Sequence, residues 1–288
     1  AIRVAFLAGH GERDIDRKGD REYYVFSQDI TYREALINNG FDCYKLFLTQ
    51  KGKIPENTDI LVIADVKTPL AKEELDEIQR YIDKGGNVII AGEPGRQDIM
   101  NPLMVSLGVK FMPGRLVQES ENFSQTLVFA KVTREVAKIF PRFNWMLRWN
   151  YRVPMLDAVG LDYRTDAGFK VMAWVETDST GCWNEMETTN FAENKAIFQP
   201  DAGEKEQVYT LALALSREIE GKEQRILIMS DADCLSNGEF SMKRRGVNTE
   251  SPIFPNYAFS WLSYGEYPID TTRPRSPDTK IYMGLEGI

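Results

Sequence analysis

Short apolar runs alternate with amphipathic segments through the N-terminal third of the chain. Runs of about five apolar residues are typical of strands that are buried on both faces of a parallel sheet. Segments whose apolar positions recur every three or four residues indicate helices that lie against such a sheet. The pattern predicts a strand at 3–9, a helix at 26–39, strands at 41–48 and 59–65, a helix at 70–84 and a strand at 87–93. This order is that of a doubly wound α/β sheet.

The middle of the chain follows a different pattern. Between residues 110 and 205, the segments 125–132 and 170–176 resemble strands, and helical periodicity is weak. We therefore predict a β-rich insertion in this region. Aromatic residues at this density usually belong to a core, although they could also line a groove for a saccharide or a peptide. The tryptophans concerned are Trp145, Trp149, Trp174 and Trp183.

The last third returns to apolar strands, which we predict at 207–216 and 225–231, followed by a short helix at 257–264. The tail after Pro268 is polar and rich in proline. Its Arg273-Pro274-Arg275 is either a solvated linker or a contact beside a membrane. The predicted division is an α/β core at 1–112 and 207–267, a β-rich insertion at 113–206, and a tail at 268–288 that leads to a membrane anchor.

Charge and composition exclude several classes of function. The net charge of −8 over 288 residues argues against a nucleic-acid-binding protein, which would need a basic face. It also argues against docking on anionic lipid by overall charge alone. The three cysteines (Cys43, Cys182 and Cys234) and the single histidine argue against a disulfide framework and against a zinc site. No apolar run reaches the roughly 18–20 residues that a membrane span needs.

Polar residues follow the ends of the predicted strands. Ligands of open α/β sheets bind beyond the carboxyl ends of the strands, so these residues are the candidate ligand-binding site. Converging carboxylates could hold a hard cation such as Mg²⁺ or Ca²⁺, or they could simply cap helices and loops. We predict no bound metal and no cofactor. The candidates are His10, Glu12, Asp65, Glu93, Asp231 and Asp233.

The loop Gly9-His10-Gly11-Glu12 resembles half of a glycine-rich phosphate-binding loop. A nucleotide site would have a third glycine where the helix begins, whereas position 14 is Asp and more charged residues follow. The alternative is a tight turn that needs glycine for its positive φ angles. The sequence favours the turn.

The parts of a nucleophilic catalyst are missing from the sequence. There is no G-x-S-x-G or G-x-C-x-G pattern of the kind that presents a nucleophile on a sharp turn. Cys234 follows Asp231-Ala232-Asp233, and acidic neighbours disfavour its thiolate. A catalytic triad would have to use His10, because no other imidazole is present. We therefore expect a protein that binds rather than an enzyme.

Several segments, in this order, resemble the auxiliary ABC-transporter family that includes the gliding-motility proteins of Bacteroidetes. Each motif is modest, and the order in which they occur is the stronger signal. The resemblance weakens between about residues 114 and 170. The matching stretches are 6–12, 35–41, 54–64, 67–75, 84–88, 100–103, 174–177 with Trp183, 225–237 and 257–262.

The resemblance implies a flavodoxin-like, three-layer fold akin to class I glutamine amidotransferases, with a mostly parallel sheet but without their catalytic cysteine. It also implies an extracytoplasmic, periplasmic domain of a membrane-anchored protein whose partners are membrane-embedded ABC transporter subunits. The family supplies no catalytic residues to transfer to this chain. The expected function is binding or coupling in transport. The alternative is a hydrolase, or a metal- or ligand-binding domain, that uses the strand-end carboxylates.

Overall fold

The computed structural model describes residues 1–250 and 253–266. Most of its strands belong to one large sheet, and β6 and β11 form a separate two-stranded ribbon. The strands are β1 (Ile2–Leu7), β2 (Phe41–Leu46), β3 (Ile60–Ala64), β4 (Asn87–Ala91), β5 (Val109–Phe111), β6 (Arg115–Gln118), β7 (Leu127–Val132), β8 (Val153–Leu156), β9 (Leu161–Tyr163), β10 (Lys170–Glu176), β11 (Cys182–Glu185), β12 (Thr210–Ile219) and β13 (Lys222–Met229).

The helices are mostly short, and α3 is the longest of those described. The α-helices are α1 (Tyr24–Gln28), α2 (Leu48–Lys51), α3 (Lys72–Asp83), α4 (Gln97–Met100), α5 (Arg134–Ala137), α6 (Pro141–Arg148), α7 (Asn237–Ser241) and α8 (Ile253–Leu262). The 3-10 segments are η1 (Leu36–Asn39), η2 (Asn101–Leu103), η3 (Val105–Leu107), η4 (Pro200–Ala202) and η5 (Ala232–Leu235).

The large sheet has the strand order β2-β1-β3-β4-β13-β12-β10-β7-β8, with β9 and β5 branching from β12. The strands from β2 to β13 are parallel to their neighbours, and those from β12 to β8 are antiparallel. The predicted α/β class is therefore confirmed. The carboxyl ends of β3, β4 and β13 lie side by side at one edge, because these strands are parallel neighbours.

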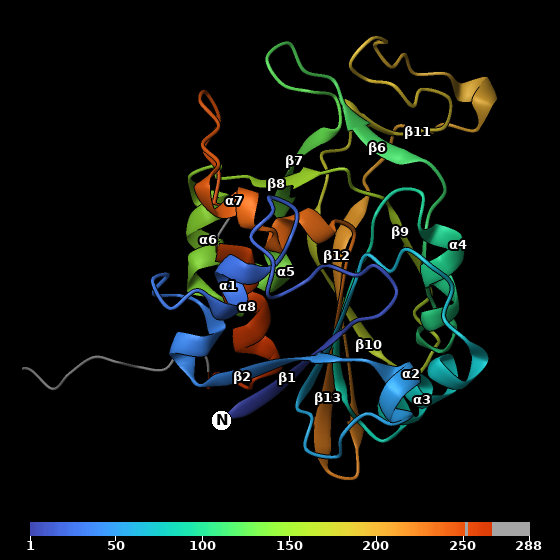
Figure 1. The fold of residues 1–288 in the computed structure, drawn as a ribbon. Helices are drawn as coiled ribbons and strands as arrows, with labels where there is room; N and C mark the ends of the chain where they lie inside the picture. The colour runs from blue at the N-terminus through green and yellow to red at the C-terminus, as the bar shows by residue number, and fades with distance from the viewer. Residues whose placement is uncertain (251–252, 267–288) are drawn as a thin grey trace, which may run out of the picture.

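Successive side chains of the parallel strands alternate between two hydrophobic cores, one on each face of the sheet. Val4 and Phe6 of β1 belong to one core, together with apolar residues of α1, α6 and α8. Ala5 and Leu7 belong to the other, together with residues of α3 and α4. Figure 1 shows these two groups of helices on opposite sides of the sheet. The arrangement explains why the parallel strands are apolar at consecutive positions rather than alternating.

The predicted helix at 26–39 is wrong. The chain forms α1, a run of turns, and then η1. The side chain of Asp29 accepts hydrogen bonds from the backbone N–H and the hydroxyl of Thr31, and this local turn competes with helix continuation. Ile30, which the periodicity placed on the buried face, is 73% exposed.

The region 113–206 is rich in strands, but most of them are not separate from the α/β sheet. β7, β8 and β10 continue the large sheet beyond β12. This region also contains α5 and α6, where the sequence showed only weak helical periodicity. Trp174 and Trp183 are fully buried, as the core interpretation expects, whereas Trp149 is 60% exposed. The division into core and insertion stays a prediction.

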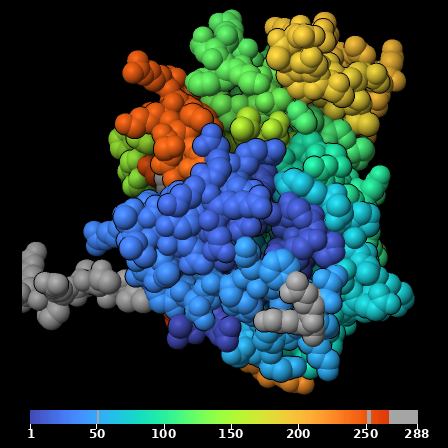
Figure 2. Space-filling model, in the orientation of Figure 1, coloured from blue at the N-terminus to red at the C-terminus, as the bar shows by residue number. Residues whose placement is uncertain are grey.

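Among residues 1–250 and 253–266, no helix has the length and apolar character to cross a bilayer. The predicted tail at 268–288, with Arg273-Pro274-Arg275, lies outside the described residues. Figure 2 shows that N-terminal residues, in blue, cover the middle of the face that it presents.

Candidate functional site

Three of the predicted strand-end carboxylates converge on one buried side chain, Arg13. Its Nε lies 2.8 Å from Asp65 Oδ2, its Nη2 lies 2.9 Å from Glu93 Oε1, and its Nη1 lies 2.6 Å from Asp233 Oδ1. The Arg13 side chain is only 1% exposed. Asp65, Glu93 and Asp233 follow β3, β4 and β13, so their meeting is a direct result of the parallel strand order. Whether they bind a ligand stays a prediction.

Further cations surround this cluster. Arg21 Nη2 lies 3.1 Å from Glu93 Oε2, and Arg21 Nε lies 3.3 Å from Asp233 Oδ1. On the other side, Lys67 Nζ lies 2.9 Å and Arg96 Nε lies 3.5 Å from the Asp65 carboxylate. Arg21 is 57% exposed, so it lies between the buried cluster and solvent. The negative charge of Asp65, Glu93 and Asp233 is thus largely neutralised by basic residues of the same chain.

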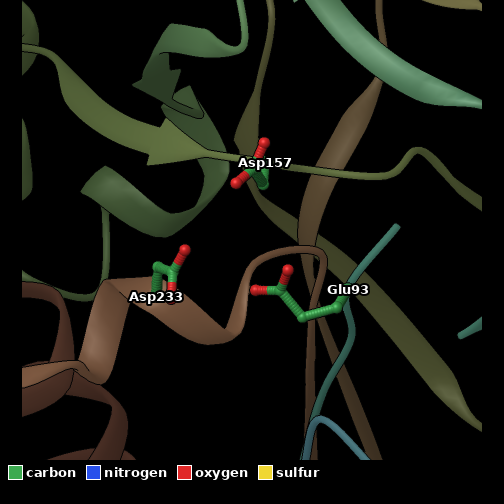
Figure 3. A group of neighbouring side chains, drawn as sticks. All are labelled: Glu93, Asp157 and Asp233. Carbon is green, nitrogen blue, oxygen red and sulfur yellow. The ribbon is translucent and has the colours of Figure 1, made fainter. Parts of the chain in front are cut away.

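Asp157, which follows β8, adds a further carboxylate. Carboxylate oxygens of Glu93, Asp157 and Asp233 lie within 4.8 Å of one another. Figure 3 shows these three side chains directed toward a common space. Arg115 Nη1 lies 3.3 Å from Asp157 Oδ1 and compensates part of its charge. Three carboxylates at this spacing could hold a hard cation, provided that Arg21 moved aside.

Crowding shifts the pKa values of these carboxyls. Burial raises the pKa of Glu93 to about 8, and Asp233 adds to the effect while Arg13 opposes it. Burial also raises the pKa of Asp157, which Arg115 lowers in part. For Asp65, burial acts upward, but hydrogen bonds from Lys67 and Arg13 bring its pKa below the ordinary value. The cluster thus raises the pKa of Glu93 and Asp157 but lowers that of Asp65.

Arg13 itself stays charged. Burial acts to lower its pKa, but Tyr23, Asp233, Glu93 and Asp65 together raise it above the ordinary arginine value. A buried guanidinium with a carboxylate at each nitrogen satisfies its hydrogen-bonding capacity within the protein. The group therefore cross-links three strand ends and the N-terminal loop.

Asp231 is buried and has a structural role at the same edge. One carboxylate oxygen accepts the backbone N–H of Leu156 at 2.9 Å, and the other accepts that of Asp233 at 2.7 Å. Burial, with Asp233 and Glu93, raises the pKa of Asp231 well above its ordinary value. The residue ties the end of β8 to the end of β13.

His10 and Glu12 form a second group at this edge. His10 Nδ1 lies 3.2 Å from Glu12 Oε1, and His10 Nε2 lies 3.0 Å from Glu74 Oε2. The backbone N–H of His10 donates to Glu12 Oε2 at 2.9 Å. The side chains of His10, Glu12 and Glu74 are all buried. Their contacts join the first loop to the start of α3.

The geometry of Gly9 and Gly11 supports the tight-turn interpretation. Their φ angles are 102° and 78°, in the left-handed region that glycine adopts without strain. The next helix, α1, begins only at Tyr24, so the N–H groups of a helix start do not face this loop. A polar cavity of about 360 Å³ opens beside the loop, lined by Gly9, Gly11, Glu12, Arg13 and Lys67 among others.

Two of the strand-end aspartates have left-handed backbone conformations. The φ angle is 54° at Asp65 and 55° at Asp157. Such angles are uncommon outside glycine, and they are found disproportionately at functional sites. Each turn directs a carboxylate from the end of its strand into the shared cluster.

Cys234 lies near this edge but is enclosed. Its thiol donates to the carbonyl oxygen of Asp231 at 3.0 Å, and burial raises its pKa well above the ordinary value. The thiol is thus neutral and inaccessible, whereas a reactive cysteine needs a thiolate and exposure.

Sequence reasoning identified Asp65, Glu93 and Asp233 but missed Arg13, Arg21 and Asp157. The strand-end rule would have found Asp157, which directly follows the apolar residues of β8. Arg13 and Arg21 lie in a charged loop that resembled a solvated segment. No pattern in the sequence distinguished the buried arginine from its exposed neighbours.

The fold and this edge define an α/β protein with a carboxylate cluster held by internal arginines. A family described as an ABC-type uncharacterized transport system matches residues 2–152, more than half of the chain. The chain belongs to this family, and the resemblance to auxiliary ABC-transport proteins is confirmed.

Two solved structures show similarity to this chain. The N-terminal domain of mmIFT52 superposes with a TM-score of 0.60 at 13% identity, over 90% of this chain and 97% of that domain. A ThuA-like protein from Parabacteroides merdae ATCC 43184 gives a TM-score of 0.45 at 9% identity, over 86% of this chain and 95% of the other. At these identities, the first likeness shows a shared fold.

One curated sequence is also similar over part of its length. It is the ribosomal RNA small subunit methyltransferase C of Marinomonas sp. (strain MWYL1), 27% identical over 146 residues. The aligned part is 49% of this chain and 38% of that protein. The chain thus spans well under half the length of this relative.

Proposed function

We propose that the chain is a non-catalytic, extracytoplasmic binding and coupling module of an ABC-type transport system. The observation that carries this proposal is the family match over residues 2–152, which includes β1, β3, β4 and the strand-end loops. The expected partners are membrane-embedded transporter subunits. The protein's own anchor would follow the C-terminal tail in a periplasmic, membrane-anchored arrangement.

The chemistry of the strand edge supports binding over catalysis. Asp65, Glu93 and Asp233 are each paired with Arg13, so they are not free to activate water or a substrate. The Cys234 thiol is buried and neutral. A general base must be within hydrogen-bond reach of a substrate proton, and a carboxylate already occupied by a guanidinium is poorly suited to that role.

The finer fold assignment is part of the proposal. Helices on both faces of the sheet agree with a flavodoxin-like, glutamine-amidotransferase-like three-layer sandwich. The assignment to the gliding-motility-type subgroup rests on the sequence motifs and is also part of the proposal. Within this scheme, the arginine-held edge would act as a rigid docking element rather than as a reaction centre.

Affinity purification from native membranes tests the proposal. The full-length protein, tagged and solubilised in mild detergent, should retain transporter permease and ATPase subunits in near-stoichiometric amounts. A phosphatase reporter fused after residue 288 would report the side of the membrane on which the domain lies. Recovery of the protein alone, or a fusion that is produced but has no phosphatase activity because it stays in the cytoplasm, would contradict it.

A second candidate function is binding of a divalent cation or a small ligand at Glu93, Asp157 and Asp233. The spacing of their oxygens, within 4.8 Å, favours it. The nearby charges of Arg13 and Arg21 oppose it, because a cation would have to compete with two guanidinium groups. Titration calorimetry with Mg²⁺ and Ca²⁺ distinguishes cation binding from the coupling role. A heat of binding that Asp157→Asn abolishes would favour cation binding. The absence of any heat would favour the coupling role.

A further inference from the structure

The segment from residue 131 to 152 differs in charge from the rest of the molecule. It contains six basic residues and one acidic residue, whereas the whole chain has a net charge of −8. The segment forms α5, α6 and the approach to β8. Its basic residues are Lys131, Arg134, Lys138, Arg142, Arg148 and Arg152, and its acidic residue is Glu135.

The two helices present one side to the core and the other to solvent. Val136, Ala137, Phe143 and Met146 are buried in the same core cluster. Because α5 and α6 also pack against each other, their exposed residues belong to one region of the surface. Figure 1 shows α6 on the outer side of the helical layer that also holds α1 and α8.

The outward side carries both charge and apolar surface. Arg134, Lys138 and Arg148 are exposed, and so are Ile139 and Trp149. We call the surface formed by these five residues the basic face. Trp149 directly follows Arg148, the last residue of α6.

Half of the basic residues in the segment already have partners. Arg142 Nη2 lies 2.7 Å from Glu250 Oε1, Arg152 Nη1 lies 2.9 Å from Asp178 Oδ1, and Lys131 Nζ lies 3.7 Å from the same carboxylate. Within residues 1–250 and 253–266, no carboxylate lies within 4.0 Å of the charged groups of Arg134, Lys138 or Arg148. The basic face is therefore a local excess of uncompensated positive charge.

We propose that the basic face binds the anionic phospholipid headgroups of a membrane surface. Exposed arginine and lysine attract anionic lipid, and a tryptophan side chain prefers the headgroup level of a bilayer. Overall negative charge does not prevent this, since charges more than about 10 Å apart are screened at moderate ionic strength. The inference deepens the proposed function, because a coupling module for a membrane transporter would be oriented by such a contact.

Vesicle co-sedimentation tests the proposal with lipid alone. The 288-residue chain is mixed with vesicles of phosphatidylcholine containing phosphatidylglycerol, and separately with vesicles of phosphatidylcholine only. The variant R134Q/K138Q/R148Q removes the three uncompensated charges of the basic face. The matched control K53Q/K195Q/K205Q removes three exposed lysines elsewhere on the surface.

The wild-type chain should bind the anionic vesicles, and raised salt should weaken the binding. The R134Q/K138Q/R148Q variant should partition roughly a hundredfold more weakly, given the usual contribution of each basic residue. The control variant should bind like the wild type, and Trp149→Ala should lose a smaller part of the affinity.

Equal binding to neutral vesicles, equal losses in both triple variants, or binding to duplex DNA but not to anionic vesicles would each overturn the proposal. Circular dichroism of each variant confirms that the fold is intact. Because these vesicles contain no protein, the result does not depend on whether transporter subunits co-purify with the chain. A failed co-purification with positive vesicle binding would count against the coupling role alone.

Discussion

Arg13 Nη1 lies 2.6 Å from Asp233 Oδ1, although the two residues are 220 positions apart in the sequence. The contact joins the first loop of the chain to the turn that follows β13. It is buried, and the same guanidinium also holds the carboxylates after β3 and β4. The N-terminal loop is thereby fixed across the carboxyl edge of the sheet, where ligands of such folds bind.

Replacing Arg13 with Met should lower the free energy of unfolding by about 3–5 kcal/mol, because breaking a buried ion pair leaves charge uncompensated. Urea denaturation followed by circular dichroism measures the change. The control is Arg17→Met, in the same loop, since Arg17 is largely exposed and pairs only loosely with Asp14. Arg17→Met should lower the free energy of unfolding by less than about 1 kcal/mol. Similar losses in the two variants would count against Arg13 as the centre of the cluster.

The free energy of unfolding should fall as the pH rises, because the pKa of Glu93 is raised in the folded state. Its pKa is raised by burial from 4.5 to about 8, so the folded state keeps a proton that the unfolded state has lost between these values. The stability from this proton is fully present below about pH 4.5 and is lost as the pH rises to about 8. Asp231, with a pKa raised in the same direction, adds to the trend.

Glu93→Gln, which mimics the protonated form, should flatten this dependence by up to about 1.4 kcal/mol per pH unit. Urea midpoints measured across the window give the slope for both proteins. Asp98→Asn provides a control, because Asp98 is an acidic residue of the nearby α4 outside the carboxylate cluster. An unchanged slope in Glu93→Gln would contradict the assignment of the raised pKa to this residue.

Gly11→Ala should destabilise the protein by about 1–2 kcal/mol, because φ at Gly11 is +78° and a left-handed backbone is costly for a residue with a Cβ. The new Cβ would also lie 3.0 Å from the Cβ of Lys67. Thermal unfolding measures the loss. Gly19→Ala, in the same loop but without a positive φ, should be neutral or slightly stabilising. A neutral Gly11→Ala would refute the tight-turn interpretation.

The sequence predicted the sheet edge well, because its signal is local. β3 is a continuous apolar run and β4 is apolar from Val88 to Ala91, and a residue that follows such a strand must lie at its carboxyl end. This rule placed Asp65 and Glu93 at one edge without knowledge of side-chain contacts. It could not pair them with Arg13, since that pairing depends on how a long charged loop folds back over the sheet.

The failures have the same origin. The helix at 26–39 was predicted from apolar spacing, but the turn formed by Asp29 and Thr31 decided the backbone locally. The sequence also did not show that β10, within the predicted β-rich insertion at 113–206, hydrogen-bonds to β12 and continues the sheet. Strand pairing between distant segments leaves no periodic signal in either partner.

Site-specific photo-crosslinking in native cells tests the central claim most directly. A photoreactive residue at Arg21, which borders the carboxylate cluster, is compared with one at Lys84, which precedes β4 at the opposite end of the sheet. The two side chains are similarly exposed, at 57% and 59%. The account predicts crosslinks from position 21 to a membrane-embedded transporter subunit, and few from position 84. Crosslinks to no transporter subunit from either position would contradict it.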